Sequence, residues 1–276
     1  VVWNGRDDSY VWMREVSGAN LGTPSNFSYG NDQAVGVSPS GRVAVAWCVT
    51  VTATADLWVA AYTPGQGWGT PMRAYQGVPG GACYDPLVAI ADNGDMAVTW
   101  SDGPSVGRPY ARAYSPASGW ETSTLVEPGI IYGSLGPGPV FSASGALLLV
   151  WYRVDTGVST CEVRYRVRLG GVWTPNQTLD ECEYPSGYPT SASYDRESFR
   201  VIYHRGDPNL AGRELWEARY VGGQGFRDRR RISAIADIQL APALALDASG
   251  RGLVAWSYRL GTQMNDPREL RAMWLE

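Results

Sequence analysis

Tyrosine, aspartate and arginine side chains recur beside the apolar segments of this sequence, where they could form a binding surface. Tyrosine offers a flat apolar ring and a hydroxyl, and a neighbouring carboxylate accepts hydrogen bonds, a combination that suits a sugar or a peptide. Arginine binds a carboxylate or a sulfate through paired hydrogen bonds. The candidate binding residues are Tyr29, Asp32, Tyr84, Asp85, Tyr132, Tyr188, Arg153, Arg205 and Arg259.

Both sets of residues also have a structural interpretation. The tyrosines can pack between neighbouring sheets, and the arginines can form surface ion pairs with acids that lie close in sequence, such as Asp155 and Asp207. The single histidine, His204, has no G-x-S-x-G motif to accompany it, so we interpret it as a bystander. We predict no catalytic residue, and we favour non-catalytic binding over enzyme activity without excluding the latter.

The charge content excludes several partners and chemistries. The 276 residues carry 23 basic and 27 acidic side chains, a net charge of −4, and these charges are scattered along the chain. A nucleic-acid partner is therefore not expected. Every basic side chain other than the histidine is arginine, which excludes Schiff-base and phosphate-loop chemistry of lysine. No run of about 18 apolar residues occurs, so no membrane-spanning segment is predicted.

One sequence pattern repeats along the chain and predicts the fold. Its copies end at Trp47, Trp100, Trp151, Tyr203 and Trp256. Each copy except the one at Tyr203 has a glycine at the same place, and the step between copies is 51 to 53 residues. Glycine at a fixed position before a short apolar run is typical of a tight hairpin turn, and each copy continues into a second hairpin. Four strands per repeat at this period indicate one blade of a β-propeller.

We therefore predict an all-β fold, a single β-propeller domain over residues 1–276 with six four-stranded blades. The approximate blade bounds are 1–33, 34–84, 85–137, 138–188, 189–240 and 241–276. Both terminal blades lack a strand in this prediction. Five complete blades are the alternative, because pairing of the chain ends would remove exposed sheet edges.

The four cysteines point to an oxidising compartment. Cys48, Cys83, Cys161 and Cys182 lack the C-x-x-C spacing of zinc ligands, so no metal site is predicted. Loop positions in the repeats favour disulfides 48–83 and 161–182 over the other two pairings and over four free thiols. Disulfides occur in secreted, periplasmic or cell-surface proteins, and we expect an extracytoplasmic protein. The chain begins at Val1, so we also expect a leader peptide upstream.

The stretch P-L-V-A-I-A-D-N-G-D-M-A-V-T-W from Pro86 to Trp100, followed by a strand and Tyr114 to Trp120, resembles the repeats of bacterial exported propeller proteins. The resemblance spans nearly the whole chain and implies the fold and export, not a reaction. More distantly the chain is similar to sialidase and Asp-box propellers. It departs from them because Asp92 and Asp247 lie in the first hairpin of a repeat, whereas an Asp box lies between the third and fourth strands.

These observations favour one function and leave two alternatives. We predict an exported, non-catalytic binding or scaffold module that recognises a glycan, a peptide or a partner protein through the channel face of the propeller. The first alternative is a glycoside hydrolase or lyase that acts on an acidic sugar, held by the arginines. The second is a structural subunit of a larger extracytoplasmic assembly, which would expose apolar side chains such as Trp12, Trp58 or Trp216. The sequence names no cofactor.

Overall fold

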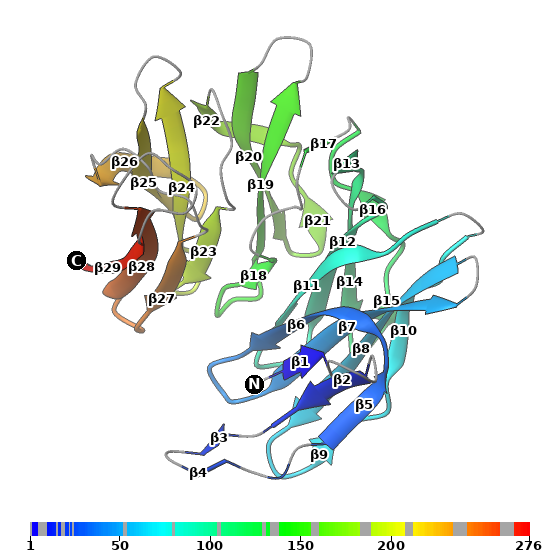
Figure 1. The fold of residues 1–276 in the computed structure, drawn as a ribbon. Helices are drawn as coiled ribbons and strands as arrows, with labels where there is room; N and C mark the ends of the chain where they lie inside the picture. Colours follow the sequence, from blue (N-terminus) through cyan, green and yellow to red (C-terminus); the bar gives the residue numbers. More distant parts are fainter. Residues whose placement is uncertain are drawn as a thin grey trace. The chain divides into compact units, whose positions relative to one another are not determined.

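The computed structural model describes residues 2–4, 10–14, 16–17, 20–21, 23, 25–51, 54–78, 81–103, 106–128, 131–132, 138–155, 160–182, 189–207, 212–233, 242–259 and 268–276. All regular structure in these residues is β-strand, which confirms the all-β prediction (Figure 1). None of them forms a helix of the length and apolar character that crossing a membrane requires. The chain divides into two compact units, Val1–Gly129 and Ile130–Glu276.

Unit one, Val1–Gly129, contains three antiparallel sheets of three or more strands. The first sheet has the order β1-β2-β5, and a short hairpin pairs β3 with β4. The second has the order β6-β7-β8-β10 with β9 added to β8, and the third has the order β11-β12-β14-β15 with β16 added to β14. The strands of this unit are β1 (Val2–Asn4), β2 (Tyr10–Met13), β3 (Val16–Ser17), β4 (Asn20–Leu21), β5 (Ser25–Tyr29), β6 (Asn31–Val37), β7 (Val43–Val51), β8 (Thr54–Thr63), β9 (Gly67–Trp68), β10 (Met72–Tyr75), β11 (Tyr84–Ile90), β12 (Met96–Ser101), β13 (Val106–Gly107), β14 (Pro109–Ser115), β15 (Gly119–Trp120) and β16 (Thr124–Leu125).

Unit two, Ile130–Glu276, also contains three antiparallel sheets. The first has the order β18-β19-β20-β21 with β22 added to β20, the second β23-β24-β25-β26, and the third β27-β28-β29. The strands are β17 (Ile131–Tyr132), β18 (Val140–Phe141), β19 (Leu147–Asp155), β20 (Thr160–Leu169), β21 (Val172–Trp173), β22 (Gln177–Cys182), β23 (Thr190–Ser193), β24 (Phe199–Asp207), β25 (Gly212–Val221), β26 (Gly225–Ser233), β27 (Ala243–Leu246), β28 (Gly252–Arg259) and β29 (Arg268–Leu275).

The repeated glycine and the repeated aromatic each have a clear structural role. Gly94 has φ of 89°, in the left-handed region that glycine adopts without steric cost, and it turns the chain between β11 and β12. Gly41, the equivalent residue one repeat earlier, has φ of 81°. The aromatic residue near the end of the second strand, such as Trp47 or Trp100, is almost fully buried in the core of its unit. The pattern in the sequence therefore marks one hairpin and one core position per repeat.

The turn of the first hairpin in one repeat is hydrogen-bonded to the equivalent turn of the next repeat at two places. The backbone N–H of Ser40 donates to Asp92 Oδ1 at 2.9 Å, and this bond is the main reason that the pKa of Asp92 is lowered. In unit two the backbone N–H of Ser144 donates to the carbonyl of Arg196 at 3.0 Å. The repeats thus contact each other through their turns as well as through their apolar faces.

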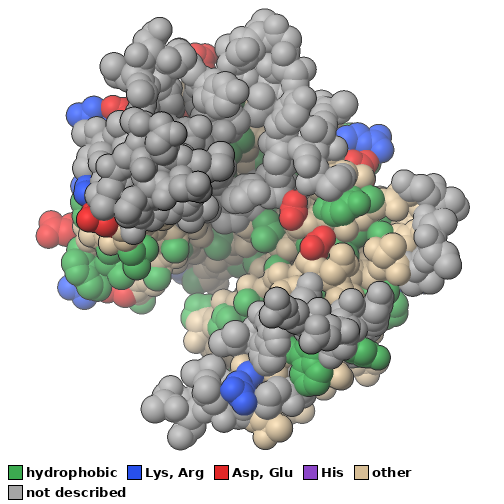
Figure 2. Space-filling view, viewed as in Figure 1, with side chains coloured by type: hydrophobic (Ala, Val, Ile, Leu, Met, Phe, Trp, Pro, Cys, Tyr) green, Lys and Arg blue, Asp and Glu red, His purple; other side chains and the backbone are tan. Residues whose placement is uncertain are grey.

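Charged side chains of the two signs lie next to each other at several places on the face seen in Figure 2. The most deeply buried ion cluster is in unit two, where Glu217 of β25 has no exposed side-chain surface. Its carboxylate oxygens lie 3.0 Å from Arg200 Nη1, 3.4 Å from Arg219 Nε and 2.6 Å from Arg230 Nε. Arg200 is itself buried, so it depends on this carboxylate to neutralise its charge.

We expect the substitution Glu217→Gln to lower the free energy of unfolding by about 3 kcal/mol, because it leaves the buried Arg200 guanidinium without a counter-charge. The matched control is Glu269→Gln, which removes an exposed carboxylate 3.3 Å from Arg271 Nη2 and should cost less than about 1 kcal/mol. Urea denaturation of both variants measures the difference. Equal losses would contradict the special role of the buried carboxylate.

Candidate functional site

Two aspartates occupy the same position in successive first strands of unit one. Asp32 lies in β6 and Asp85 lies in β11, 53 residues later, so both belong to the strands themselves and not to the loops that enter them. The antiparallel register shifts at both places, between Asn31 and Ala34 and between Tyr84 and Leu87, which marks a bulge in each strand. Asp32 and Asp85, hereafter the acid pair, have φ of 49° and 47°. Few residues other than glycine adopt this conformation, and aspartate is one that tolerates it.

The two first strands approach each other closely. A Cβ atom at Gly36 of β6 would lie 2.5 Å from the carbonyl oxygen of Val88 of β11, so only glycine fits there. The acid pair is near enough for its members to interact: burial raises the pKa of Asp32, and the negative charge of Asp85 raises it further. Burial also raises the pKa of Asp85. The predicted residues Asp32 and Asp85 therefore come close enough for their charges to interact, although the Asp85 side chain is exposed.

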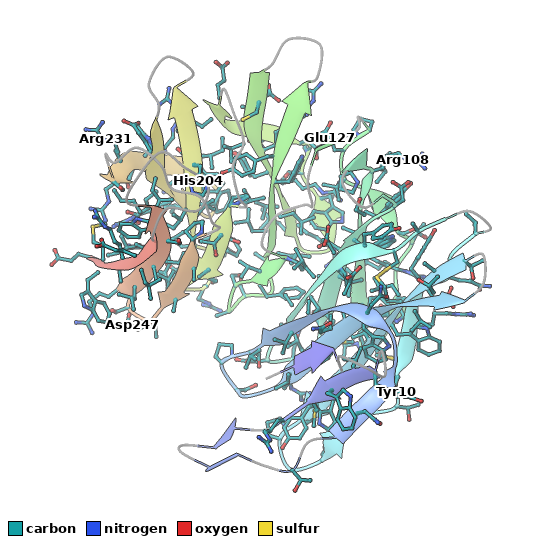
Figure 3. The ribbon with its side chains drawn as sticks, viewed as in Figure 1. Tyr10, Arg108, Glu127, His204, Arg231 and Asp247 are labelled. Carbon is teal, nitrogen blue, oxygen red and sulfur yellow. A yellow bond between two sulfur atoms is a disulfide. The ribbon has the colours of Figure 1, made fainter. Side chains whose placement is uncertain are left out.

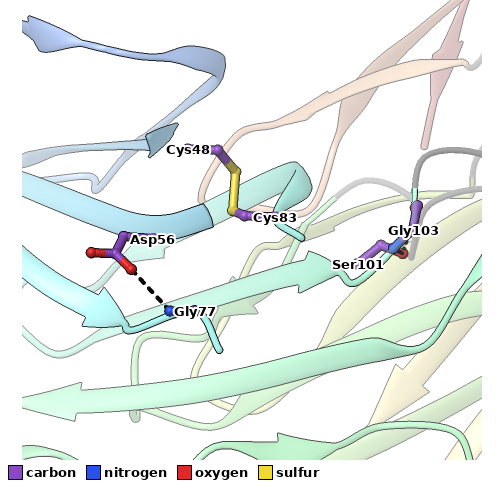
Figure 4. The surroundings of a disulfide bond; sticks show 6 residues. All are labelled: Cys48, Asp56, Gly77, Cys83, Ser101 and Gly103. Atoms are coloured by element: carbon purple, nitrogen blue, oxygen red, sulfur yellow. Dashed lines mark hydrogen bonds between the residues drawn. A yellow bond between two sulfur atoms is a disulfide. The ribbon is translucent and has the colours of Figure 1, made fainter. Parts of the chain in front are cut away.

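A disulfide joins β7 to Cys83, the residue that directly precedes β11 (Figure 4). Cys48 of β7 is the register partner of Asn31, the residue before Asp32, and Cys83 directly precedes β11. The sulfur atoms are 2.00 Å apart and both side chains are buried, which confirms the predicted 48–83 pairing. Near the disulfide, Asp56 Oδ1 accepts a hydrogen bond from the backbone N–H of Gly77 at 2.9 Å, which connects β8 to the segment after β10.

The second pair of cysteines lies in a different setting from the one predicted. Cys161 lies in β20 and Cys182 in β22, in directly paired register, so both are strand residues and the expectation of comparable loops was wrong. Cys161 is disulfide-bonded, and the side chain of Cys182 lies outside the described residues. This cross-strand position joins the third and fourth strands of one sheet, whereas Cys48 and Cys83 join successive repeats.

Of the predicted tyrosines, the described part of the chain places only Tyr84 in detail. Tyr84 is half-buried at the start of β11, next to Asp85 in sequence. Tyr29 and Tyr132 lie in β5 and β17 with side chains outside the described residues, and Tyr188 lies outside them altogether. Tyr75 contacts Trp100, which stacks on Tyr110 with ring centroids 5.5 Å apart. These three rings belong to the core, because Trp100 is buried.

The predicted arginines belong to unit two and are engaged in local contacts. Arg153 Nη1 lies 3.5 Å from Glu162 Oε2, a different acid from the expected Asp155, whose side chain lies outside the described residues. Arg205 lies over the ring of Trp216, and the Arg259 side chain lies outside the described residues. His204 is completely buried between β19 and β25, where the hydroxyl of Tyr152 accepts its backbone N–H at 2.7 Å (Figure 3). It is therefore a core residue and no part of a binding surface.

Sequence reasoning missed the partners that surround Arg205. Tyr203 donates its hydroxyl proton to Asp180 Oδ2 at 2.8 Å, and burial together with the Asp180 charge raises the pKa of Tyr203. Arg229 and Arg231 of β26 form ion pairs with Asp180 and Glu214, and residues 227–231 are all exposed along this edge strand of the sheet. Only the strand register, which pairs Trp216 with both Tyr203 and Arg231, reveals this grouping. No group of three or more metal-ligating side chains occurs among the described residues.

Comparison with known proteins identifies the fold. No family model matches the sequence, and no curated protein matches it. Three similar solved structures have a TM-score of 0.55: an α-L-arabinanase of Penicillium chrysogenum complexed with arabinobiose (14% identical, covering 99% of this chain and 88% of that one), the BP39L lectin of Burkholderia pseudomallei (16%, 95% and 78%) and the polysaccharide lyase Uly1 (13%, 91% and 59%). The similar structures are β-propeller proteins, which confirms the predicted fold class at that level. The similarity to sialidases and the number of blades stay predictions.

The raised pKa values predict how Asp85→Asn changes stability with pH. In the unfolded chain these aspartates lose their protons near the ordinary pKa of 3.8, whereas in the folded chain they lose them at a higher pH. The free energy of unfolding therefore falls as the pH rises between the two pKa values, and the acid pair destabilises the fold at any higher pH. Asp85→Asn should raise the free energy of unfolding at pH 7 by about 0.5 kcal/mol, a modest gain because solvent screens the carboxylates. The gain should disappear below about pH 3.8.

Thermal unfolding from pH 3 to pH 8 measures this effect. Asp228→Asn is the matched control, because Asp228 has a similar left-handed backbone conformation, with φ of 52°, and lies in β26 among arginines. It should produce no gain at pH 7. A gain of the same size in both variants would assign the effect to backbone strain and contradict the charge explanation.

Removal of the first disulfide should be costly. The double substitution of Cys48 and Cys83 by alanine frees a connection that spans 35 residues of sequence, and chain entropy alone predicts a loss of about 4 kcal/mol of unfolding free energy. Urea denaturation of the double variant against the oxidised protein measures it. A loss below 1 kcal/mol would show that the close approach of β6 and β11 persists without the covalent link.

Proposed function

We propose that this chain is an extracytoplasmic β-propeller that binds a glycan without transforming it. The proposed architecture is one domain of six blades at the bounds given above, with five blades as the alternative. The observation that carries the proposed function is the acid pair, with Tyr84 beside it, at equivalent bulges of two successive first strands. Export is supported by the disulfide, since such bonds persist in oxidising compartments.

The acid pair is suited to a polyhydroxylated ligand. In a propeller the first strands of the blades surround the central channel, so the side chains at these bulges would face the channel mouth. Carboxylate oxygens of Asp32 and Asp85 would accept hydrogen bonds from sugar hydroxyls, and the half-buried ring of Tyr84 would supply an apolar face. The bulges, the glycine contact and the disulfide hold these groups in place before the ligand arrives, which reduces the entropic cost of binding.

A glycan fits better than the other two ligand classes that the sequence left open. A lectin and an arabinanase share the fold, although at identities that carry no residue-level argument. A peptide or a partner protein could also use the tyrosine and the carboxylates, and Tyr29, Tyr132 and Tyr188 would extend the surface for any of the three. We place the glycan first because two neighbouring carboxylates at equivalent bulges can accept several hydrogen bonds from the hydroxyl groups of one sugar.

A glycoside hydrolase is the second candidate, and the acid pair itself favours it. Such enzymes use two carboxyl groups, one of which is kept protonated by its surroundings, and the raised pKa of Asp32 beside Asp85 is an arrangement of this kind. The substrate of such an enzyme at this pair would be neutral, because two carboxylates repel a third. A hydrolase or lyase that acts on an acidic sugar would need Arg153, Arg205 and Arg259 to bind the sugar carboxylate.

A structural subunit of a larger assembly is supported by exposed apolar residues of β29, not by the tryptophans named from the sequence. Trp12, Trp58 and Trp216 are half-buried and form no exposed apolar surface of the kind that the sequence analysis required. In β29, however, Leu270 and Trp274 expose 80% and 74% of their surface. An exposed apolar pair of this size is a feature of contact surfaces, so a structural subunit stays the third candidate.

The test combines binding and turnover. We expect the purified protein to bind a neutral oligosaccharide on a glycan array, and Asp32→Asn and Asp85→Asn each to weaken the dissociation constant about tenfold by calorimetry, since each removes a charged hydrogen-bond acceptor. The matched control Asp228→Asn should leave it unchanged. Reducing-end release from the same oligosaccharide should be absent. Release that both acid-pair variants abolish would establish the hydrolase, and no binding to any glycan would overturn the proposal.

A further inference from the structure

Three half-exposed guanidinium groups of unit two gather around one tryptophan. Arg205 comes from β24, Trp216 from β25, and Arg229 and Arg231 from β26, and we call these four residues the arginine patch. The Arg205, Arg229 and Arg231 side chains expose 45%, 50% and 52% of their surface, so all three guanidinium groups reach solvent. Arg231 projects outward from β26 in Figure 3.

One carboxylate fixes the tryptophan side of the arginine patch. Glu214 Oε2 accepts the indole N–H of Trp216 at 2.9 Å, and Glu214 Oε1 accepts a hydrogen bond from Arg231 Nη1 at 2.7 Å. These bonds and the nearby arginines keep the pKa of Glu214 low despite partial burial, so it is ionised. The Arg205 guanidinium carbon lies 5.1 Å from the centroid of the Trp216 ring, within the range of a cation–π contact.

A second carboxylate leaves Arg205 only weakly paired. Asp180 accepts the hydroxyl proton of Tyr203 at 2.8 Å and lies 3.7 Å from Arg229 Nη1, which donates to the carbonyl of Leu179 at 2.8 Å. Arg205 Nη1 lies 4.0 Å from Asp180 Oδ2, beyond hydrogen-bond distance, and this is its closest carboxylate oxygen among the described side chains. Among the described side chains of this patch, three positive groups therefore meet two negative ones, which leaves one positive charge on an exposed surface.

We propose that the arginine patch binds the carboxylate of an acidic sugar. The Arg205 guanidinium lies over the Trp216 ring and nearly half of its side chain is exposed, so a ligand can reach its N–H donors. A carboxylate accepts two parallel hydrogen bonds from such a fork, and its charge neutralises the surplus. The half-buried indole of Trp216 supplies an apolar edge for the sugar ring. This site goes beyond the proposed function, because the acid pair lies in unit one and suits a neutral ligand.

Calorimetry with three probes tests the proposal: an oligogalacturonide, its methyl-esterified neutral form, and inorganic sulfate. We expect binding of the oligogalacturonide in low salt, at least tenfold weaker binding of the neutral form, and weakening in 0.5 M salt, where surface charges are screened. Arg205→Gln should reduce the affinity about tenfold. Arg205→Lys, which keeps the charge and loses the fork, should also reduce it.

The matched control is Arg73→Gln, since Arg73 also exposes 45% of its side chain and lies 3.4 Å from Asp56 in unit one. It should leave the affinity unchanged. Binding of sulfate as tight as that of the oligogalacturonide would reduce the site to a general anion site. No binding of any probe, or equal losses in the Arg205 and Arg73 variants, would overturn the proposal and identify the patch as a set of internal ion pairs.

Discussion

The backbone of β6 passes so close to β11 at Gly36 that no side chain fits between the two strands. This approach brings two bulges into proximity, and the bulges place two aspartates where their charges interact. The disulfide between Cys48 and Cys83 limits how far the strands can separate at that end. The chemistry available at the acid pair is thus a product of backbone geometry, because no single side chain determines it.

The two units handle charge in opposite ways. In unit one, the acid pair has no described basic partner close by, and the folded chain accepts an energetic penalty at neutral pH that a ligand could relieve. In unit two, acids and arginines are combined into clusters, from the fully buried Glu217 to the partly buried Glu214. Arg205 lies 4.0 Å from the nearest described carboxylate oxygen, a weaker contact than those of its neighbours. Charge is unbalanced at both places where we propose binding, with opposite signs.

The sequence predicted the elements better than the contacts between them. The spacing of Gly41 and Gly94 and the apolar runs that end at Trp47 and Trp100 predict hairpins and core positions, because turn geometry and burial are local properties. The sequence also predicts the pairing of Cys48 with Cys83, since each lies near a strand end.

Other features depend on register, which the sequence does not reveal. The expected loop positions of Cys161 and Cys182 were wrong because β20 and β22 pair as far as these two residues, and only the register shows this. The arginine run of β26 finds its acidic partners only through a register that shifts beside Trp216. The left-handed conformation of Asp32 and Asp85 carries no sequence signal either, since aspartate is also common in ordinary turns.

Hydrogen bonds between equivalent turns make the position of one hairpin depend on that of its neighbour. Asp92 holds the turn that contains Ser40, and Arg196 holds the turn that contains Ser144, each across 52 residues. Folding free energy is therefore shared between neighbours, as in other arrays of repeated units. Where such bonds occur, removal of one hairpin would also take a hydrogen-bond partner from its neighbour, so adjacent turns depend on each other for their stability.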